Sequence, residues 1–136
     1  MRAANVTALS PVKPRPWKSG TTWAEQQKLT ASDGVQADGF GDSVALAGDT
    51  AVVGASADDD LGGSSGSVYV FVRRGTSWRE RYKLTASDGG ELDEFGLSVS
   101  LDGNTALVGA PERAQNYIGY GSAYVIDITL LTLLAP

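Results

Sequence analysis

A tandem repeat with a period of 55 residues constrains this chain more than any other feature of its sequence. Residues 28–34 recur unchanged as residues 83–89, and 27 of 53 positions are identical when residues 20–72 are aligned with 75–127. Other pairs at the same spacing are Trp23 and Trp78, Phe40-Gly41 and Phe95-Gly96, Gly54-Ala55 and Gly109-Ala110, and Tyr69-Val70 and Tyr124-Val125. The chain therefore contains two copies of one structural unit.

Each copy is expected to form four strands. In the first copy these are residues 25–31, 43–46, 50–55 and 67–72, and residues 80–86 are the second copy of the first of them. The 17 glycines of the chain indicate many tight turns, and therefore many short strands. The turns at Gly48-Asp49 and at residues 102–104 predict hairpins, because such turns need a positive φ. No sustained apolar period of 3.6 residues is present, so almost no helix is expected.

Two of these strands, residues 50–55 and 67–72, are apolar on both faces. An antiparallel sheet with one solvated face would instead alternate apolar and polar residues. We therefore expect each small sheet to lie between neighbouring sheets, as a four-stranded blade of a β-propeller does. The predicted fold is all-β, a partial propeller of two antiparallel repeats. The expected divisions are an irregular extension at 1–19, repeats at 20–74 and 75–127, and an apolar tail at 128–136.

The motifs of each copy resemble the FG-GAP repeat. Phe40-Gly41 is followed by an apolar strand and Gly54-Ala55, and the second copy has Phe95-Gly96 and then residues 109–111, Gly-Ala-Pro. The Trp and Leu-Thr-Ala-Ser-Asp-Gly elements resemble the bacterial branch of this family. The resemblance implies propeller blades like those of integrin α subunits, at the cell surface or outside the cell. The calcium loop of integrin repeats is not expected here, because residues 47–49 and 102–104 are too short to supply six to eight oxygen ligands.

Composition narrows the chemistry that the chain can perform. It has no Cys and no His, which excludes thiol nucleophiles, disulfides and imidazole bases. The net charge of −5 and the lack of a Lys/Arg patch argue against nucleic acid as a partner. The apolar run at 126–135 is about half the ~20 residues that a membrane span needs. Residues 1–16 lack the apolar core of a signal peptide. We expect a protein without catalytic activity.

Several polar and aromatic residues are candidates for a binding site. Asp58, Asp59 and Asp60 could together hold a hard cation such as calcium. A solvated loop is the favoured alternative, since the aligned residues are Arg113, Ala114 and Gln115. Asp33 and Asp38 persist in the second copy as Asp88 and Asp93, for which turn chemistry is favoured over a ligand site. Trp23 and Trp78 are expected to pack against a neighbouring sheet, and Tyr117 and Tyr120 are possible loop contacts.

Two repeats are too few to close a ring of blades, since propellers usually have four to eight. The chain is therefore expected to be a fragment of a longer propeller, a unit that self-associates into a ring, or a partly open pair of sheets. The leading function is noncatalytic recognition of an unidentified protein or glycan, or a structural role. The alternatives are a calcium-assisted adhesion module and a propeller glycoside hydrolase or lyase.

Overall fold

The computed structural model describes residues 23–112 and 119–133. The elements are β1 (Phe40–Ala47), β2 (Thr50–Ala55), β3 (Ser67–Arg74), β4 (Ser77–Leu84), β5 (Ser98–Asp102), β6 (Thr105–Ala110), β7 (Ser122–Asp127) and the short helix α2 (Thr129–Leu133). The first sheet has the order β1-β2-β3-β4, the second has the order β5-β6-β7, and every pair is antiparallel. The predicted all-β fold of partial propeller blades is confirmed. The extension expected at 1–19 lies outside the described residues.

Both predicted hairpins form. Ala47 pairs with Thr50 across the loop Gly48-Asp49, and Asp102 pairs with Thr105 across the matching loop of the second repeat. The first loop residue has a positive φ in each case, 56° at Gly48 and 57° at Gly103. The second loop residue, Asp49 or Asn104, does not have a positive φ. The turns therefore resemble type II′, in which glycine is favoured at the first position.

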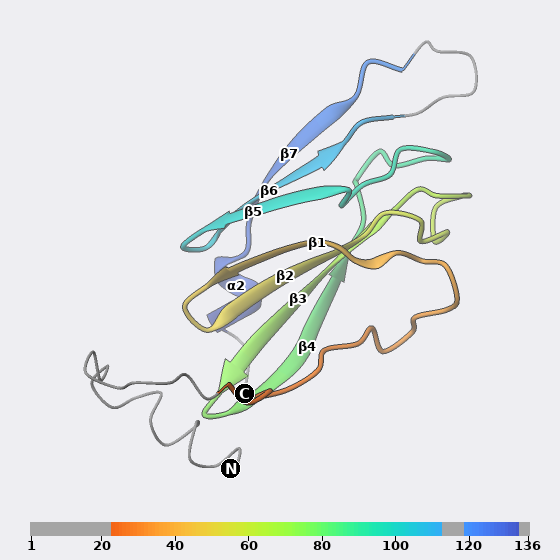
Figure 1. Cartoon of the computed structure of the whole chain (residues 1–136). Coiled ribbons are helices and arrows are strands. Elements are labelled where there is room, and N and C mark those ends of the chain that lie inside the picture. The colour runs from red at the N-terminus through yellow and green to blue at the C-terminus, as the bar shows by residue number, and fades with distance from the viewer. Residues whose placement is uncertain (1–22, 113–118, 134–136) are drawn as a thin grey trace.

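The two sheets lie side by side, with β1 next to β5, and share one core (Figure 1). Val52, Val68 and Val70 of the first sheet are fully buried against Val108 of the second. Each of these residues would expose apolar surface if the sheets separated, and fully burying such a side chain stabilises a fold by about 1.5–3 kcal/mol. As predicted from their two apolar faces, β2 is buried along its whole length and β3 along all but its last two residues.

A glycine contact sets how closely the sheets approach. Gly54 of β2 lies against the backbone of Gly96, so a Cβ at Gly54 would lie 1.9 Å from the carbonyl oxygen of Gly96. The hydroxyl of Ser43 donates a hydrogen bond of 2.6 Å to the same oxygen. The backbones can approach this closely because neither Gly54 nor Gly96 carries a Cβ atom.

The strand expected at residues 25–31 does not form. Residues 23–32 run instead along the other face of the first sheet, where Leu29 and Ala31 pack on a cluster that includes Tyr69 and Phe71. The segment is held by side chains, because the Gln27 amide bonds both the N–H and the carbonyl of Trp78 at 2.8 Å. A strand needs a backbone partner. The homologous strand β4 has β3 beside it, whereas no third strand of a preceding blade lies beside residues 23–32 among the described residues.

The chain after β7 does not form a fourth strand in the second sheet. It turns into α2. Ile128, just before this helix, is fully buried, and Leu131 of α2 packs with it in the core between the sheets. The apolar tail predicted at 128–136 thus begins inside the core, and residues 134–136 lie outside the described part. None of the helices within residues 23–112 and 119–133 has the length and apolar character required to cross a membrane.

Candidate functional site

Loops from both repeats gather at one end of the two sheets (Figure 1). We call this the loop end, which comprises residues 32–39, 56–66, 85–97, 111–112 and 119–121. The two aspartates that persist in both repeats lie in these loops. Asp38 accepts a 2.8 Å hydrogen bond from the N–H of Val35, and Asp93 accepts a 2.7 Å bond from the N–H of Gly90. The turn chemistry expected of this pair is confirmed.

The other persistent pair, Asp33 and Asp88, binds tyrosines instead. The hydroxyl of Tyr69 donates a 2.8 Å hydrogen bond to Asp33, and that of Tyr124 donates a 2.7 Å bond to Asp88. Both tyrosines also pack edge-on against the Phe of their own repeat, Phe40 or Phe95, with ring centroids 5.3 Å apart. Each blade therefore carries the same Asp–Tyr–Phe unit at the loop end.

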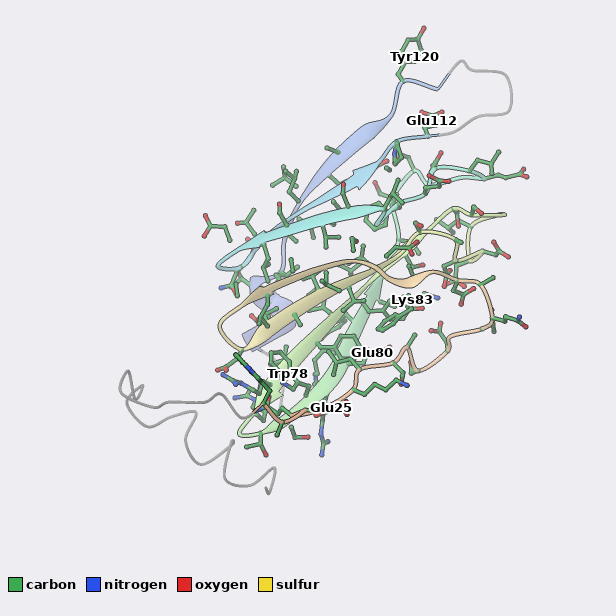
Figure 2. All side chains as sticks on the ribbon, viewed as in Figure 1. Glu25, Trp78, Glu80, Lys83, Glu112 and Tyr120 are labelled. Atoms are coloured by element: carbon green, nitrogen blue, oxygen red, sulfur yellow. The ribbon has the colours of Figure 1, made fainter. Side chains whose placement is uncertain are left out.

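In the first repeat the Asp and the Tyr of this unit contact the ammonium group of Lys83, whose side chain is labelled in Figure 2. The Nζ atom of Lys83 lies 2.7 Å from an oxygen of Asp33, 2.9 Å from Asp58 and 2.7 Å from Asp60. It also lies 5.4 Å from the ring centroid of Tyr69, in the range of a cation–π contact. Lys83 stands opposite Tyr69 in the β3–β4 register, which places its side chain at this end of the sheet.

The charges of this cluster stabilise one another. The hydrogen bond from Lys83 is the main cause that holds the pKa of Asp33 below its ordinary value. Burial favours the neutral form of Asp58, but bonds from Lys83 and from the N–H of Asp60 outweigh it and keep its pKa low. Burial likewise opposes the charge on Lys83, and its three carboxylate partners raise its pKa nevertheless. The cluster is an ammonium site closed by carboxylates.

The candidates Asp58, Asp59 and Asp60 do not act as one group. Asp58 is buried and contacts Lys83 together with the half-exposed Asp60, whereas Asp59 accepts a bond from the N–H of Ser64. In the part of the chain that the structure describes, no three acidic side chains are arranged to hold a metal ion. The metal site proposed at these residues stays a prediction, and the cation that the structure places there is Lys83.

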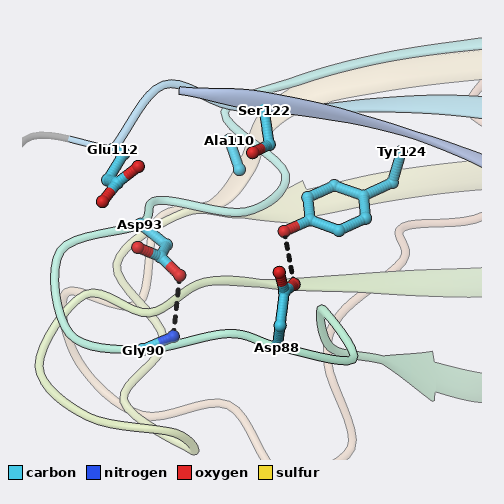
Figure 3. A pocket seen from close by; sticks show the side chains of 7 residues that line it. All are labelled: Asp88, Gly90, Asp93, Ala110, Glu112, Ser122 and Tyr124. Atoms are coloured by element: carbon cyan, nitrogen blue, oxygen red, sulfur yellow. Dashed lines mark hydrogen bonds between the residues drawn. The ribbon is translucent and has the colours of Figure 1, made fainter. Parts of the chain in front are cut away.

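The matching position in the second repeat is an open pocket. Figure 3 shows its lining residues, Asp88, Gly90, Asp93, Ala110, Glu112, Ser122 and Tyr124, around a volume of about 210 Å³. The bond between Tyr124 and Asp88 raises the pKa of the Tyr124 hydroxyl. The pocket has the Asp–Tyr pair of the first repeat and a further carboxylate from Glu112. No lysine of the described residues enters it, because the second sheet lacks a fourth strand.

The aromatic candidates differ from one another. Trp78 packs on the face of the first sheet, and its indole N–H donates a 2.8 Å bond to Gln26, so the packing expected of it is confirmed. The same expectation was wrong for Trp23, which is 86% exposed, because neither sheet formed by residues 23–112 and 119–133 covers it. Tyr120 is almost fully exposed beyond the pocket (Figure 2), and Tyr117 lies outside the described residues.

Lys83 and Tyr69 are the site residues that the sequence interpretation missed. Both recur at the repeat spacing, as Lys28 and Tyr124, alongside Asp33 and Asp88. A lysine, a tyrosine and an aspartate that persist together in a repeat suggest a shared contact. That signal lay in the joint recurrence of three residue types rather than in the run of three adjacent acids.

A comparison with known protein families finds a match for each of the two repeats. The family model described as the FG-GAP repeat matches residues 23–71 and again residues 78–126, which is most of the chain. A search of curated proteins gives no match. Both matched segments include the Phe-Gly element, the strand with the close glycine and the tyrosine strand described above. The chain belongs to the FG-GAP repeat family.

Proposed function

We propose that this propeller-type repeat module is a noncatalytic recognition module whose pocket at Asp88 and Tyr124 binds a cationic side chain of a protein partner. FG-GAP repeats are typically structural or recognition modules, which supports a role in binding. Part of the same proposal is a location at the cell surface or outside the cell, as in the proteins that the motifs resemble. The proposal depends on one observation, the ammonium group held by the equivalent residues of the first repeat.

The first repeat supplies the model for the bound state. There Asp33 and the ring of Tyr69 contact the ammonium group of Lys83, a side chain that is only 17% exposed. In the second repeat Asp88 and Tyr124 keep the same hydrogen bond, while Glu112 and Asp93 border the open space. A pocket with this lining favours a positive group, because carboxylates and an aromatic face both attract cations. A lysine or arginine side chain fits these requirements.

A titration followed by NMR tests this proposal. Nα-acetyl-lysine amide should shift the amide signals of Gly90 and Tyr124 with a dissociation constant in the millimolar range, whereas Nα-acetyl-norleucine amide should not. Asp88→Asn should abolish the shifts, and the control Asp102→Asn, at the opposite end of the second sheet, should retain them. Unchanged spectra at about 10 mM lysine probe, measured with the protein dilute enough to be monomeric, would contradict the proposal.

Calcium chloride is the informative competitor in the same experiment. If calcium at about 1 mM shifts these signals and displaces the lysine probe, calcium-assisted adhesion becomes the better account of the pocket. If calcium leaves the signals unchanged while the lysine probe shifts them, the pocket recognises an organic cation.

A further inference from the structure

The outer face of the second sheet is a repeat of a face that is buried in the first. Leu107 is 45% exposed and Val125 is 74% exposed. Their equivalents 55 residues earlier are Val52 and Val70, which are fully buried against the second sheet. The same surface is therefore covered in one repeat and open in the other, and the cover in the first repeat is another blade.

The opposite face of the first sheet is open at β1 in the complementary way. Val44 and Leu46 of β1 are 68% and 67% exposed. Their equivalents in the second repeat, Val99 and Leu101, pack into the core between the two sheets. Within residues 23–112 and 119–133, no blade therefore packs on the β1 side of the first sheet or on the Leu107 side of the second. Each exposed face carries the half of the sheet–sheet contact that the other is missing.

The strand missing from the second sheet exists elsewhere in the chain. β7 pairs with β6 alone within the described residues, whereas its equivalent β3 pairs with both β2 and β4. Residues 23–31 are the sequence copy of β4 and already lie beside the first sheet, with Leu29 packed there much as Leu84 packs beside the second. This segment occupies the place of an outer strand whose blade is absent.

The charges of Lys28 and of the pocket at Asp88 fit the pairing of residues 23–31 with β7. In the β3–β4 register Lys83 stands opposite Tyr69, so the repeat spacing places Lys28 opposite Tyr124 when residues 23–31 pair with β7. Lys28 is exposed and makes no ion pair with another described residue. The carboxylates of Asp58 and Asp60 have no acidic equivalent in the second repeat, and Glu112 contributes a carboxylate to the pocket in their place.

We propose that copies of this chain associate head to tail. Residues 23–31 of one copy form the fourth strand of the sheet β5–β7 of a second copy, and Lys28 enters the pocket at Asp88 and Tyr124. Leu107 and Val125 of the second copy then cover Val44 and Leu46 of the first. The proposal rests on the proposed function, because it identifies the cationic partner of that pocket. Repetition of one such contact closes into a ring of blades, and propellers have four to eight.

A charge exchange tests the contact at the pocket. Light scattering of the full chain should give a molar mass that is a discrete multiple of 14.1 kDa. Either Lys28→Asp or Asp88→Lys should raise the dissociation constant of the assembly by about tenfold or more. Mixing the two variants, or combining both changes in one chain, should restore the assembly. Arg79→Glu is the matched control and should associate normally. It reverses the charge of an exposed residue on β4, just as Lys28→Asp reverses a charge within residues 23–31.

A cross-link tests the strand pairing. The chain has no cysteine of its own, and the proposed register places Gln27 opposite Val125. Residues opposite each other in an antiparallel pair have Cβ atoms about 4.5–5.5 Å apart, close enough for a strand-to-strand disulfide after small adjustment. Mixed Gln27→Cys and Val125→Cys chains should therefore form a hetero-disulfide on mild oxidation. The control pair Gln27→Cys and Leu107→Cys should not, because Leu107 lies one strand further away.

The outcomes separate the two proposals. A chain that is monomeric at every concentration, or Lys28 and Asp88 variants that associate like the parent, would overturn the head-to-tail contact. The lysine probe is then titrated into Lys28→Asp, in which no neighbouring copy supplies the ammonium group. Binding of the probe to this variant leaves the proposed function standing while the association fails. Absence of both binding and association contradicts both proposals.

Discussion

At the scale of single residues, the ammonium group of Lys83 balances the charge of the first repeat. Its partners Asp33, Asp58 and Asp60 come from two loops that are 25 or more residues apart in the sequence, so one cation joins these loops to β4. Asp58 is buried, and a buried carboxylate without a partner is costly. The ion pair between Lys83 and Asp58 therefore holds the loops against β4, because moving them away would leave the charge of Asp58 without a partner.

Replacing Lys83 by Met should destabilise the fold by about 2 kcal/mol at neutral pH, because the buried charge of Asp58 loses its partner. The folded-state pKa of Asp58 lies below 3.8, so its contribution is present above that pH and is lost as the pH falls further. The difference between parent and Lys83→Met should therefore begin to shrink as the pH falls below about 3.8, and it should vanish only below the lowered pKa, where Asp58 of the parent is neutral too.

Urea unfolding at several pH values measures this difference. Arg79→Met, on the exposed side of the same strand, is the control and should show a difference near zero throughout. The pKa of Lys83 is raised above 10.5, so the stabilisation should stay complete from neutral pH up to pH 10.5 and decline at higher pH. A difference that stays constant from neutral pH to acid pH would contradict the role given to this ion pair.

These residues also show what the sequence can and cannot predict about the site. The turn bonds of Asp38 and Asp93 were predictable, because an aspartate beside glycines acts on its own loop. The contact between Lys83 and Asp58 was not, since it depends on the register of β4 against β3 and on the path of a loop 25 residues away. Side-chain clusters that join distant segments require the fold first.

At the scale of elements, one sequence adopts two structures. Residues 28–34 and 83–89 are identical, yet residues 83–84 end the strand β4 and residues 28–29 are not in a strand. The difference lies in what borders each copy, because β4 follows β3 through a hairpin, whereas no strand of the described residues pairs with residues 23–31. Hydrophobic pattern predicted the strands β2, β3 and β6 correctly, but pattern alone cannot state whether a partner strand exists.

The two glycines in the middle strands give a matched pair of variants. Gly54→Ala should destabilise the fold by about 2 kcal/mol, because the new methyl group would meet the backbone carbonyl of Gly96, which cannot rotate away. At Gly109 the added methyl group meets only the Ser98 hydroxyl, which can turn towards solvent. Gly109→Ala should therefore unfold near the parent's midpoint when both are measured as dilute monomers by circular dichroism. Equal losses at the two positions would show that the approach of the sheets does not set the requirement for glycine.

At the scale of the whole molecule, the repeat describes both what is packed and what is left open. One contact between sheets is made within the chain, through Val52 and Val70 on one side and Val99 and Leu101 on the other. The same contact is left unmade at both outer faces, where Leu107 and Val125 lie at one end and Val44 and Leu46 at the other. A duplicated unit thus carries surfaces that match its own neighbour, and two copies satisfy only half of them.

Adjacent residues of β6 distinguish the internal contact from the external one. Val108 is fully buried and faces the first sheet, so Val108→Ala should lower the free energy of unfolding by about 2 kcal/mol at any protein concentration. Leu107 points the opposite way, and Leu107→Ser should cost little in a dilute monomer but remove any gain in stability with concentration. That gain follows from mass action, because assembly stabilises only the folded state. Thermal unfolding at two protein concentrations measures both effects. The concentrations should differ by about a hundredfold, because that ratio shifts a mass-action equilibrium by about 2.7 kcal/mol. If the unfolding midpoint of the parent does not depend on protein concentration, Leu107 has no partner in a second copy. If the midpoint depends on concentration in the parent but not in Leu107→Ser, the face that carries Leu107 lies in the contact between copies.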